Sequence, residues 1–221
     1  MTSAPSAVRA VIFDLDGTLV DSMPLVLRAF AHALAPFRPD LDEQAIFQRL
    51  GGPPARMMFE LIGDEAKAAE ALRRLDGFGF DNGALVEPFA GMKVLLEALH
   101  AQGFLLAIWT GRDRRGTEAI LAAHGIAGLF RTVVCGDDLD THKPHPGGLI
   151  EILARLSVQP EEALYAGDAD ADVLGGSEAG VRTLMITHGR EVDLVISTRA
   201  WCLVDTPEQA YALLRETVVN G

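Results

Sequence analysis

Two aspartates, Asp14 and Asp16, stand two residues apart directly after the short apolar run of residues 8–13. Gly17 follows and lets the backbone turn sharply, so both carboxylates can face one site at a strand end. Like charges this close repel each other unless a cation binds or one carboxyl keeps its proton. The pair suits a division of labour in which one carboxylate attacks and the other handles protons. The structural alternative is an Asx turn, which Asp-Gly often forms where a chain leaves a strand.

Similar apolar runs recur along the chain and indicate a sheet. They occupy residues 105–110, 132–135, 163–166, 183–186 and, more weakly, 201–204. Helix-like patterns lie between them, at residues 92–99, 117–124, 147–156 and 172–179. Strands that alternate with helices predict a parallel sheet covered on both faces, which is a Rossmann-like α/β core. Ligands of such folds bind at the carboxyl ends of the strands, where the aspartate pair lies.

Residues 22–87 interrupt this alternation. They contain helical patterns at residues 24–34, 41–50, 56–62 and 64–75, no convincing strand, and an expected loop at residues 77–83. We therefore predict an all-helical cap of residues 22–87, inserted into a core made of residues 1–21 and 88–221. An insert placed after the first strand could act as a lid over the site.

Composition restricts the class of protein. The chain has 221 residues, 49% of them hydrophobic, which suffices for one sizeable core with a smaller insert. Its 19 Lys and Arg against 31 Asp and Glu give a net charge of −12, which argues against nucleic-acid or anionic-membrane partners. No apolar stretch reaches the roughly 18 residues that span a bilayer, and residues 1–7 lack the basic and apolar regions of a secretion signal. With only two cysteines, these features predict a cytoplasmic protein.

Three further short motifs follow predicted strands in order: Thr110-Gly111, Lys143-Pro144, and GDADAD at residues 167–172, which fits the pattern GDxxxD at Asp168 and Asp172. Together with the aspartate pair they resemble the haloacid dehalogenase superfamily, subgroup I, and its phosphoglycolate-phosphatase-like members. The resemblance covers nearly the whole chain. It implies a Rossmann-like core, a helical cap and phosphoryl transfer through an aspartyl-phosphate.

The resemblance also implies a role for each motif residue. Asp14 is the expected nucleophile, and Asp16 the acid that protonates the leaving group and then activates water. Thr110 and the backbone near Gly111 would hold phosphoryl oxygens, and Lys143 would neutralise charge. The expected Mg²⁺ ligands are Asp14, the backbone carbonyl of Asp16, Asp168, and Asp172 directly or through water. Hard oxygen ligands suit Mg²⁺, and phosphoryl transfer needs in-line positioning and neutralisation of spreading charge.

Two arginines depart from or extend this pattern. The second motif often reads Thr-Asn or Ser-Asn in the family, whereas this chain has Thr110-Gly111 followed by Arg112. Gly111 thus replaces the asparagine, and the contact that its side-chain amide would make is lost. Surface base rates favour a solvated loop arginine at Arg112 over one that contributes charge to the site. Arg56 follows a segment, residues 52–55, that resembles the cap loop facing the active site in phosphoglycolate-phosphatase-like members. Arg56 is therefore a candidate contact for the distal end of the substrate, with a solvated helix-start arginine as an equal alternative.

The aspartate pair also favours one reaction within the superfamily. Dehalogenases lack the second aspartate, and phosphonate-cleaving members replace it and use a cap lysine, whereas Lys67 of this cap lies in a solvated-looking stretch. We predict a Mg²⁺-dependent phosphatase that hydrolyses a phosphate monoester of a small metabolite. The alternative is a β-phosphoglucomutase-like sugar phosphomutase, which shares all four motifs. The predicted cap has only His32 and Lys67 as its histidine and lysine, so it is short of polar groups for that reaction.

A rival from another class is a non-catalytic phosphate-binding regulatory protein on the same fold. The intact set of Asp14, Asp16, Lys143 and Asp168 argues against it. The substrate stays open among phosphoglycolate, a sugar phosphate, a nucleotide and pyrophosphate, because specificity depends on the cap. The default assembly is a monomer or a homodimer.

Overall fold

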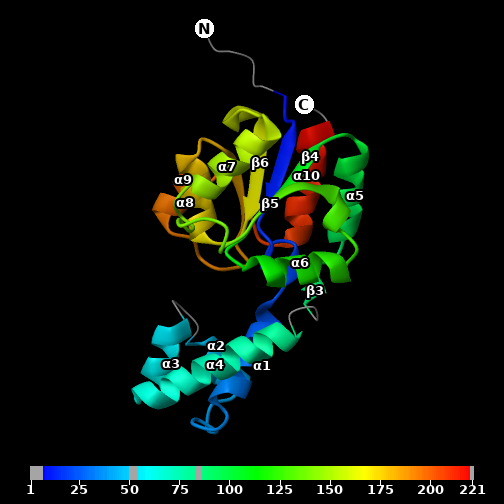
Figure 1. Ribbon diagram of the computed structural model, residues 1–221. Helices are drawn as coiled ribbons and strands as arrows, with labels where there is room; N and C mark the ends of the chain where they lie inside the picture. The colour runs from blue at the N-terminus through cyan, green and yellow to red at the C-terminus, as the bar shows by residue number, and fades with distance from the viewer. Residues whose placement is uncertain (1–6, 50–53, 83–85, 220–221) are drawn as a thin grey trace. The chain divides into compact units, whose positions relative to one another are not determined.

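The structure is a computed structural model that describes residues 7–49, 54–82 and 86–219 (Figure 1). The chain divides into two compact units, one of Met1–Asp21 with Glu87–Gly221 and the other of Ser22–Val86. The two units are joined at a short antiparallel ribbon that belongs to the first, made of β2 (Val20–Asp21) and β3 (Glu87–Pro88). Glu87, assigned to the insert from the sequence, therefore pairs within the first unit.

The first unit contains a six-stranded parallel sheet, which confirms the predicted Rossmann-like α/β fold. Its strand order is β5-β4-β1-β6-β7-β8. The strands are β1 (Ala10–Phe13), β4 (Leu105–Trp109), β5 (Phe130–Val134), β6 (Ala163–Gly167), β7 (Arg182–Ile186) and β8 (Cys202–Val204). The chain builds outward from β1 through β4 to β5, then returns to place β6 on the other side of β1. Folds of this kind bind ligands beside the strand where the order reverses.

Strand β1 is buried on both faces, with all four of its residues fully buried. A strand covered on both faces reads as a continuous apolar run rather than as an alternating one, as this strand does. In register, Phe13 lies beside Ile108 of β4 and Ala166 of β6. The carboxyl ends of these three strands are therefore nearly level, and the residues that follow them share one edge of the sheet.

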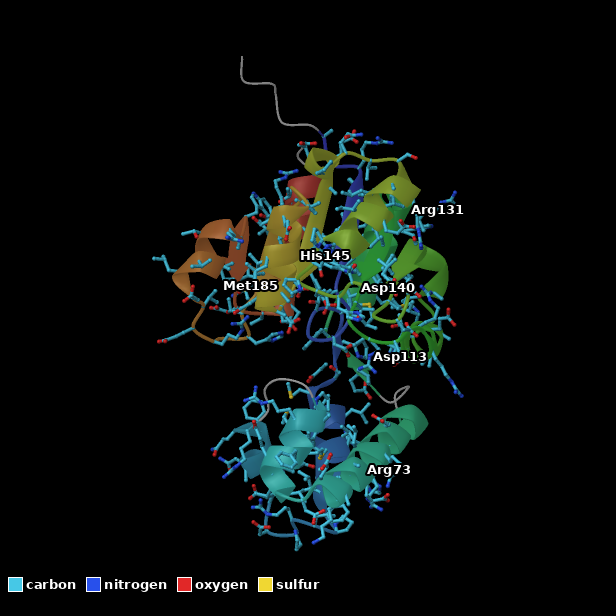
Figure 2. The ribbon with its side chains drawn as sticks, turned by 60° about the vertical axis from the view of Figure 1, so that its left-hand side comes forward. Arg73, Asp113, Arg131, Asp140, His145 and Met185 are labelled. Atoms are coloured by element: carbon cyan, nitrogen blue, oxygen red, sulfur yellow. The ribbon has the colours of Figure 1, made fainter. Side chains whose placement is uncertain are left out.

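Helices cover both faces of the sheet. Figure 1 shows α7 (Gly147–Leu156), α8 (Asp170–Glu178) and α9 (Leu194–Arg199) on one side, and α5 (Met92–Ala101) and α10 (Pro207–Val219) on the other. Helix α7 has the bounds expected from its pattern. Helix α6 (Arg114–Ala123) begins earlier than expected, because Asp113, labelled in Figure 2, caps it by accepting a hydrogen bond from the Gly116 N–H at 2.8 Å.

The second unit contains helices and no strand in its described part. It consists of α1 (Met23–Leu34), α2 (Glu43–Phe47), α3 (Pro54–Ile62) and α4 (Glu65–Asn82). The expected loop at residues 77–83 is wrong for residues 77–82, which continue α4. The rings of His32 on α1 and Phe78 on α4 lie 5.0 Å apart, so the two helices still pack here. That packing outweighs the roughly 1 kcal/mol that Gly77 costs inside a helix.

The exposed side of α4 carries ordinary helix-surface pairs. Arg73, labelled in Figure 2, donates from Nε to the Glu70 carboxylate at 3.1 Å. Among the described residues, no helix combines the length and the apolar character needed to cross a membrane.

Candidate active site

Three acidic side chains meet at the carboxyl edge of the sheet. Asp14 follows β1, while Asp168 and Asp172 flank the start of α8, and one carboxylate oxygen from each lies within 4.8 Å of the others. The Asp14 N–H donates to the Ala166 carbonyl at 2.8 Å, which extends the β1–β6 ladder and points this residue at the edge. Gly17 has a φ of 76°, and a Cβ there would collide with the Asp168 carboxylate. The turn after the first motif therefore requires glycine.

Lys143 reaches into this cluster from the loop before α7. Its Nζ donates to Asp14 Oδ1 at 2.6 Å and to Asp172 Oδ1 at 2.7 Å, and it lies 4.9 Å from the centre of the Trp109 ring. Burial lowers the pKa of Lys143, but Asp14 and then Asp172 outweigh burial, so the net pKa is raised and the ammonium stays charged. The geometry thus joins the first, third and fourth sequence motifs in one hydrogen-bonded group.

The Asp172 carboxylate receives four hydrogen bonds. Besides Lys143, the Tyr165 hydroxyl donates to Oδ1 at 2.7 Å, and the N–H groups of Asp168 and Ala169 donate to Oδ2 at 3.1 and 2.9 Å. Burial, reinforced by Asp172, raises the pKa of Tyr165 well above its usual value, so the hydroxyl keeps the proton that it donates. In this arrangement Asp172 fixes Lys143 against Asp14. Tyr165 was not singled out from the sequence, because a tyrosine within the apolar run of β6 predicts only a residue of the hydrophobic core.

One lysine among three carboxylates leaves an excess of negative charge. Burial raises the pKa of Asp14 well above its usual value despite the opposing effect of Lys143. Burial, followed by the charge of Asp172, raises the pKa of Asp168 to about 7. A largely buried, all-oxygen donor set with surplus negative charge suits a hard divalent cation. The residues present therefore fit a Mg²⁺ ion.

The raised pKa of Asp168 predicts a pH-dependent response to Mg²⁺. A carboxyl whose folded, metal-free pKa exceeds its unfolded value stabilises the fold below about pH 4 and loses that contribution as pH rises through about 7. We therefore expect Mg²⁺ to raise the melting temperature more at pH 8 than at pH 6, since protons compete for the site at the lower pH. Thermal unfolding with EDTA or Mg²⁺ at both pH values measures this.

Two variants complete that measurement. Asp168→Asn should lose most of the Mg²⁺-induced shift at pH 8. Asp170→Asn, which removes a surface carboxylate paired with Arg190 at 2.6 Å, should keep it. A shift of equal size at both pH values, or one that survives in Asp168→Asn, would contradict a cation bound through Asp168.

The Asp16 side chain is paired with Arg112, outside the acidic cluster. Arg112 donates from Nε to Oδ2 at 2.9 Å and from Nη2 to Oδ1 at 2.6 Å, a fork that engages both carboxylate oxygens. The two side chains are only 19% and 30% exposed. The expectation that Arg112 is a solvated loop arginine is therefore wrong. The Arg112 N–H donates to Thr110 Oγ1 at 3.1 Å, and this turn after β4 aims the side chain back toward the segment that follows β1.

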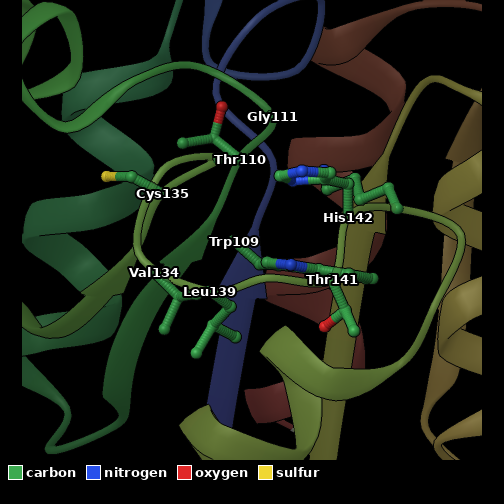
Figure 3. A pocket seen from close by; sticks show the side chains of 10 residues that line it. Trp109, Thr110, Gly111, Val134, Cys135, Leu139, Thr141 and His142 are labelled. Carbon is green, nitrogen blue, oxygen red and sulfur yellow. The ribbon is translucent and has the colours of Figure 1, made fainter.

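A pocket of about 140 Å³ opens beside Lys143 (Figure 3). This volume is several times the roughly 30 Å³ of one water molecule and has room for a small anion. The lining includes the predicted phosphate-binding residues Thr110 and Gly111, together with Lys143 and His142. Thr110 is 2% exposed and is anchored by its N–H, which donates to the Val134 carbonyl at 3.0 Å.

The loop after β7 also contacts the site segments. His188 Nε2 lies 2.7 Å from the Gly17 carbonyl oxygen, and Arg190 donates to the Asp168 carbonyl at 3.1 Å. Neither residue was singled out from the sequence. Only their place in the sequence could have marked them as site residues, because they follow a predicted strand as the other site segments do.

Arg56 lies on α3 in the helical unit. It pairs with Glu60 at 2.7 Å, and its side chain is 74% exposed. Gly52 and Pro53 of the segment that resembles a substrate-facing loop fall outside the described residues. A contact between Arg56 and substrate stays a prediction.

Comparisons with known proteins relate the chain to a family and to named relatives. Residues 11–186 match the family model for haloacid dehalogenase-like hydrolases. Pyrophosphatase PpaX of Bacillus cereus (strain Q1) is 33% identical over 181 residues, which cover 81% of this chain and 83% of that protein.

Two solved structures share the fold. One is a predicted phosphoglycolate phosphatase from Haemophilus somnus 129PT, with a TM-score of 0.81 and 24% identity over 96% of this chain and all of that one. The other is a subfamily IA hydrolase of the same superfamily from Geobacter sulfurreducens, with a TM-score of 0.75 and 21% identity over 97% of this chain and all of that one. At these identities the likeness concerns the fold.

Proposed function

The chain belongs to the haloacid dehalogenase-like hydrolases, and we propose that it is a Mg²⁺-dependent phosphatase that hydrolyses a small phosphate monoester through a phosphorylated Asp14. One observation carries the proposal. Asp14 is a 6% exposed carboxylate beside the strand where the sheet order reverses, and it is held by Lys143 within a cluster that has surplus negative charge. Such a carboxylate can serve as a nucleophile, and a cation bound beside it, together with Lys143, would offset its charge and that of an approaching phosphate.

The reaction has two steps. The Asp14 carboxylate attacks phosphorus, the bond to the leaving oxygen breaks, and protonated Asp16 gives its proton to that oxygen. Asp16 then takes a proton from water, the water oxygen attacks the phosphorus, the bond between phosphorus and the Asp14 oxygen breaks, and inorganic phosphate leaves with the Asp14 carboxylate restored. Thr110, Gly111 and Lys143 hold the phosphoryl oxygens. When bound through Asp14 and Asp168, with Asp172 and the Asp16 carbonyl as further candidates, Mg²⁺ would supply positive charge against the phosphoryl group.

Two substrate types have support. A phosphoglycolate-like monoester is the class that the sequence resemblance implies. Inorganic pyrophosphate is the second candidate, because the curated relative that is 33% identical is called a pyrophosphatase.

A phosphate-release assay on a small panel tests the proposal. We expect release from at least one of 2-phosphoglycolate, pyrophosphate, a sugar phosphate and a nucleotide, lost with EDTA and restored by Mg²⁺. Conversion of glucose 1-phosphate to glucose 6-phosphate without phosphate release would indicate the phosphomutase instead. Binding of phosphate with no turnover of any panel member would indicate the regulatory protein.

A further inference from the structure

The ion pair between Arg112 and Asp16 joins the predicted acid to the loop whose Thr110 and Gly111 line the pocket beside Lys143. Both carboxylate oxygens of Asp16 accept from the guanidinium, at 2.9 and 2.6 Å. Burial lowers the pKa of Arg112, but the hydrogen bonds and charge of Asp16 outweigh it, so the guanidinium is held as a cation. A partly buried cation of this kind needs a counter-ion in every state of the site.

We propose that Arg112 is a specificity-determining residue that selects substrates whose leaving group carries its own negative charge. The inference rests on the proposed function and deepens it. On substrate binding, Arg112 exchanges one of its hydrogen bonds to Asp16 for one to a carboxylate or phosphate on the leaving part of the substrate.

The exchange follows from the work assigned to Asp16. To reach the leaving oxygen, Asp16 must turn one of its oxygens toward the substrate. Both oxygens accept from the Arg112 guanidinium in this structure, so that turn breaks one of the two hydrogen bonds of the fork. The guanidinium then lacks part of its pairing when the substrate is bound. A substrate that brings a second anionic group restores that pairing, whereas a neutral leaving group leaves the cation partly unpaired.

The position of Arg112 fixes which part of the substrate it meets. Its N–H is bonded to Thr110 Oγ1 at 3.1 Å, so it belongs to the same turn as the phosphate-binding residues. Its guanidinium meets the residue that protonates the leaving oxygen, so it lies on the leaving-group side of the scissile bond. The second anion must therefore be close to that oxygen, as in 2-phosphoglycolate or pyrophosphate. Arginine suits this task better than lysine because its planar fork matches carboxylate and phosphate oxygens.

A matched pair of substrates tests the inference. 2-Phosphoglycolate and 2-hydroxyethyl phosphate differ in that a carboxylate is replaced by a neutral hydroxymethyl group. Wild-type enzyme should prefer 2-phosphoglycolate. Arg112→Gln should raise the KM for 2-phosphoglycolate, and for pyrophosphate, by about 10- to 100-fold, which is the usual size of a lost charge-assisted contact. The KM for 2-hydroxyethyl phosphate should change only about twofold to threefold by the same reasoning.

Two further variants sharpen the test. Arg112→Lys keeps the charge without the fork and should recover part of the preference for the anionic substrate. Arg155→Gln removes an exposed arginine paired with Glu151 on α7 and should leave both KM values unchanged. Equal losses on both substrates in Arg112→Gln would overturn the inference while leaving the phosphatase intact. Failure of wild-type enzyme to release phosphate from any panel member would overturn the proposed function and the inference together.

Discussion

Replacing Asp14 with asparagine should reduce kcat for phosphate release by about 10⁴-fold or more while the protein stays folded. The amide is neutral and cannot form the acyl phosphate that Asp14 provides, and residues that act as one catalytic unit lose most of the rate when any member is removed. Steady-state phosphate release with Mg²⁺ measures the loss.

The same variant makes a second, opposite prediction about stability. Asparagine keeps the size of Asp14, still accepts from Lys143, and removes one of the surplus negative charges in the cluster. In EDTA, its melting temperature should equal or exceed that of the wild type. Asp140→Asn, which removes an exposed carboxylate labelled in Figure 2, is the matched control and should keep its activity. An Asp14→Asn enzyme within tenfold of the wild-type rate would have lost no more than about 1.4 kcal/mol of activation free energy. That result would rule out Asp14 as the nucleophile.

Replacing Lys143 with methionine should destabilise the metal-free protein by about 3–5 kcal/mol, the usual cost of removing one partner of a buried ion pair. The change leaves Asp14 and Asp172, which are 6% and 0% exposed, without the ammonium that now lies 2.6 and 2.7 Å from them. Phosphate release should fall too, because the same ammonium would neutralise the transferred group. Urea unfolding in EDTA at pH 7 gives the free energy of unfolding.

The pH dependence of that loss identifies its cause. The stranded carboxylates can escape the penalty by taking up protons, so Lys143→Met should be less destabilised at pH 5 than at pH 8. Lys67→Met, which removes an exposed lysine from α4, should change the free energy of unfolding little at either pH. A Lys143→Met protein as stable as wild type in EDTA would show that the carboxylates are not held by this lysine. The opposite signs expected for Asp14→Asn and Lys143→Met separate charge compensation from a general loss of packing.

The elements that position the site could be predicted because they have strong local signals. The strand that precedes Asp14 is buried on both faces and reads as an unbroken apolar run. The helical pattern at residues 147–156 predicted both ends of α7 correctly. Elements with weaker signals were missed: α9 has six residues, and the ribbon of β2 and β3 pairs only two residues from each strand. In α4, Gly77 suggested a loop, although packing between α1 and α4 keeps the segment helical.

The candidate site likewise has features that could be predicted from the sequence and features that could not. The residues of the four motifs follow strands whose ends meet at one edge, so their proximity could be inferred. The partner of Asp16 could not, because Arg112 lies 96 residues away and the turn that aims it depends on its hydrogen bond to Thr110. Nor could the sequence show that Asp172 accepts from Tyr165 as well as from Lys143. Side-chain pairs between distant segments depend on tertiary geometry, for which a single sequence carries no local signal.

The most direct test of the central claim is to trap the phosphorylated enzyme. Wild-type protein turning over substrate with Mg²⁺ is quenched in acid, digested, and searched by mass spectrometry for a phosphorylated peptide. We expect the phosphate on Asp14, within the peptide that contains β1, and its absence in Asp14→Asn. Phosphate on another residue, or no trapped phosphate during steady turnover, would contradict the assignment of Asp14 as the nucleophile.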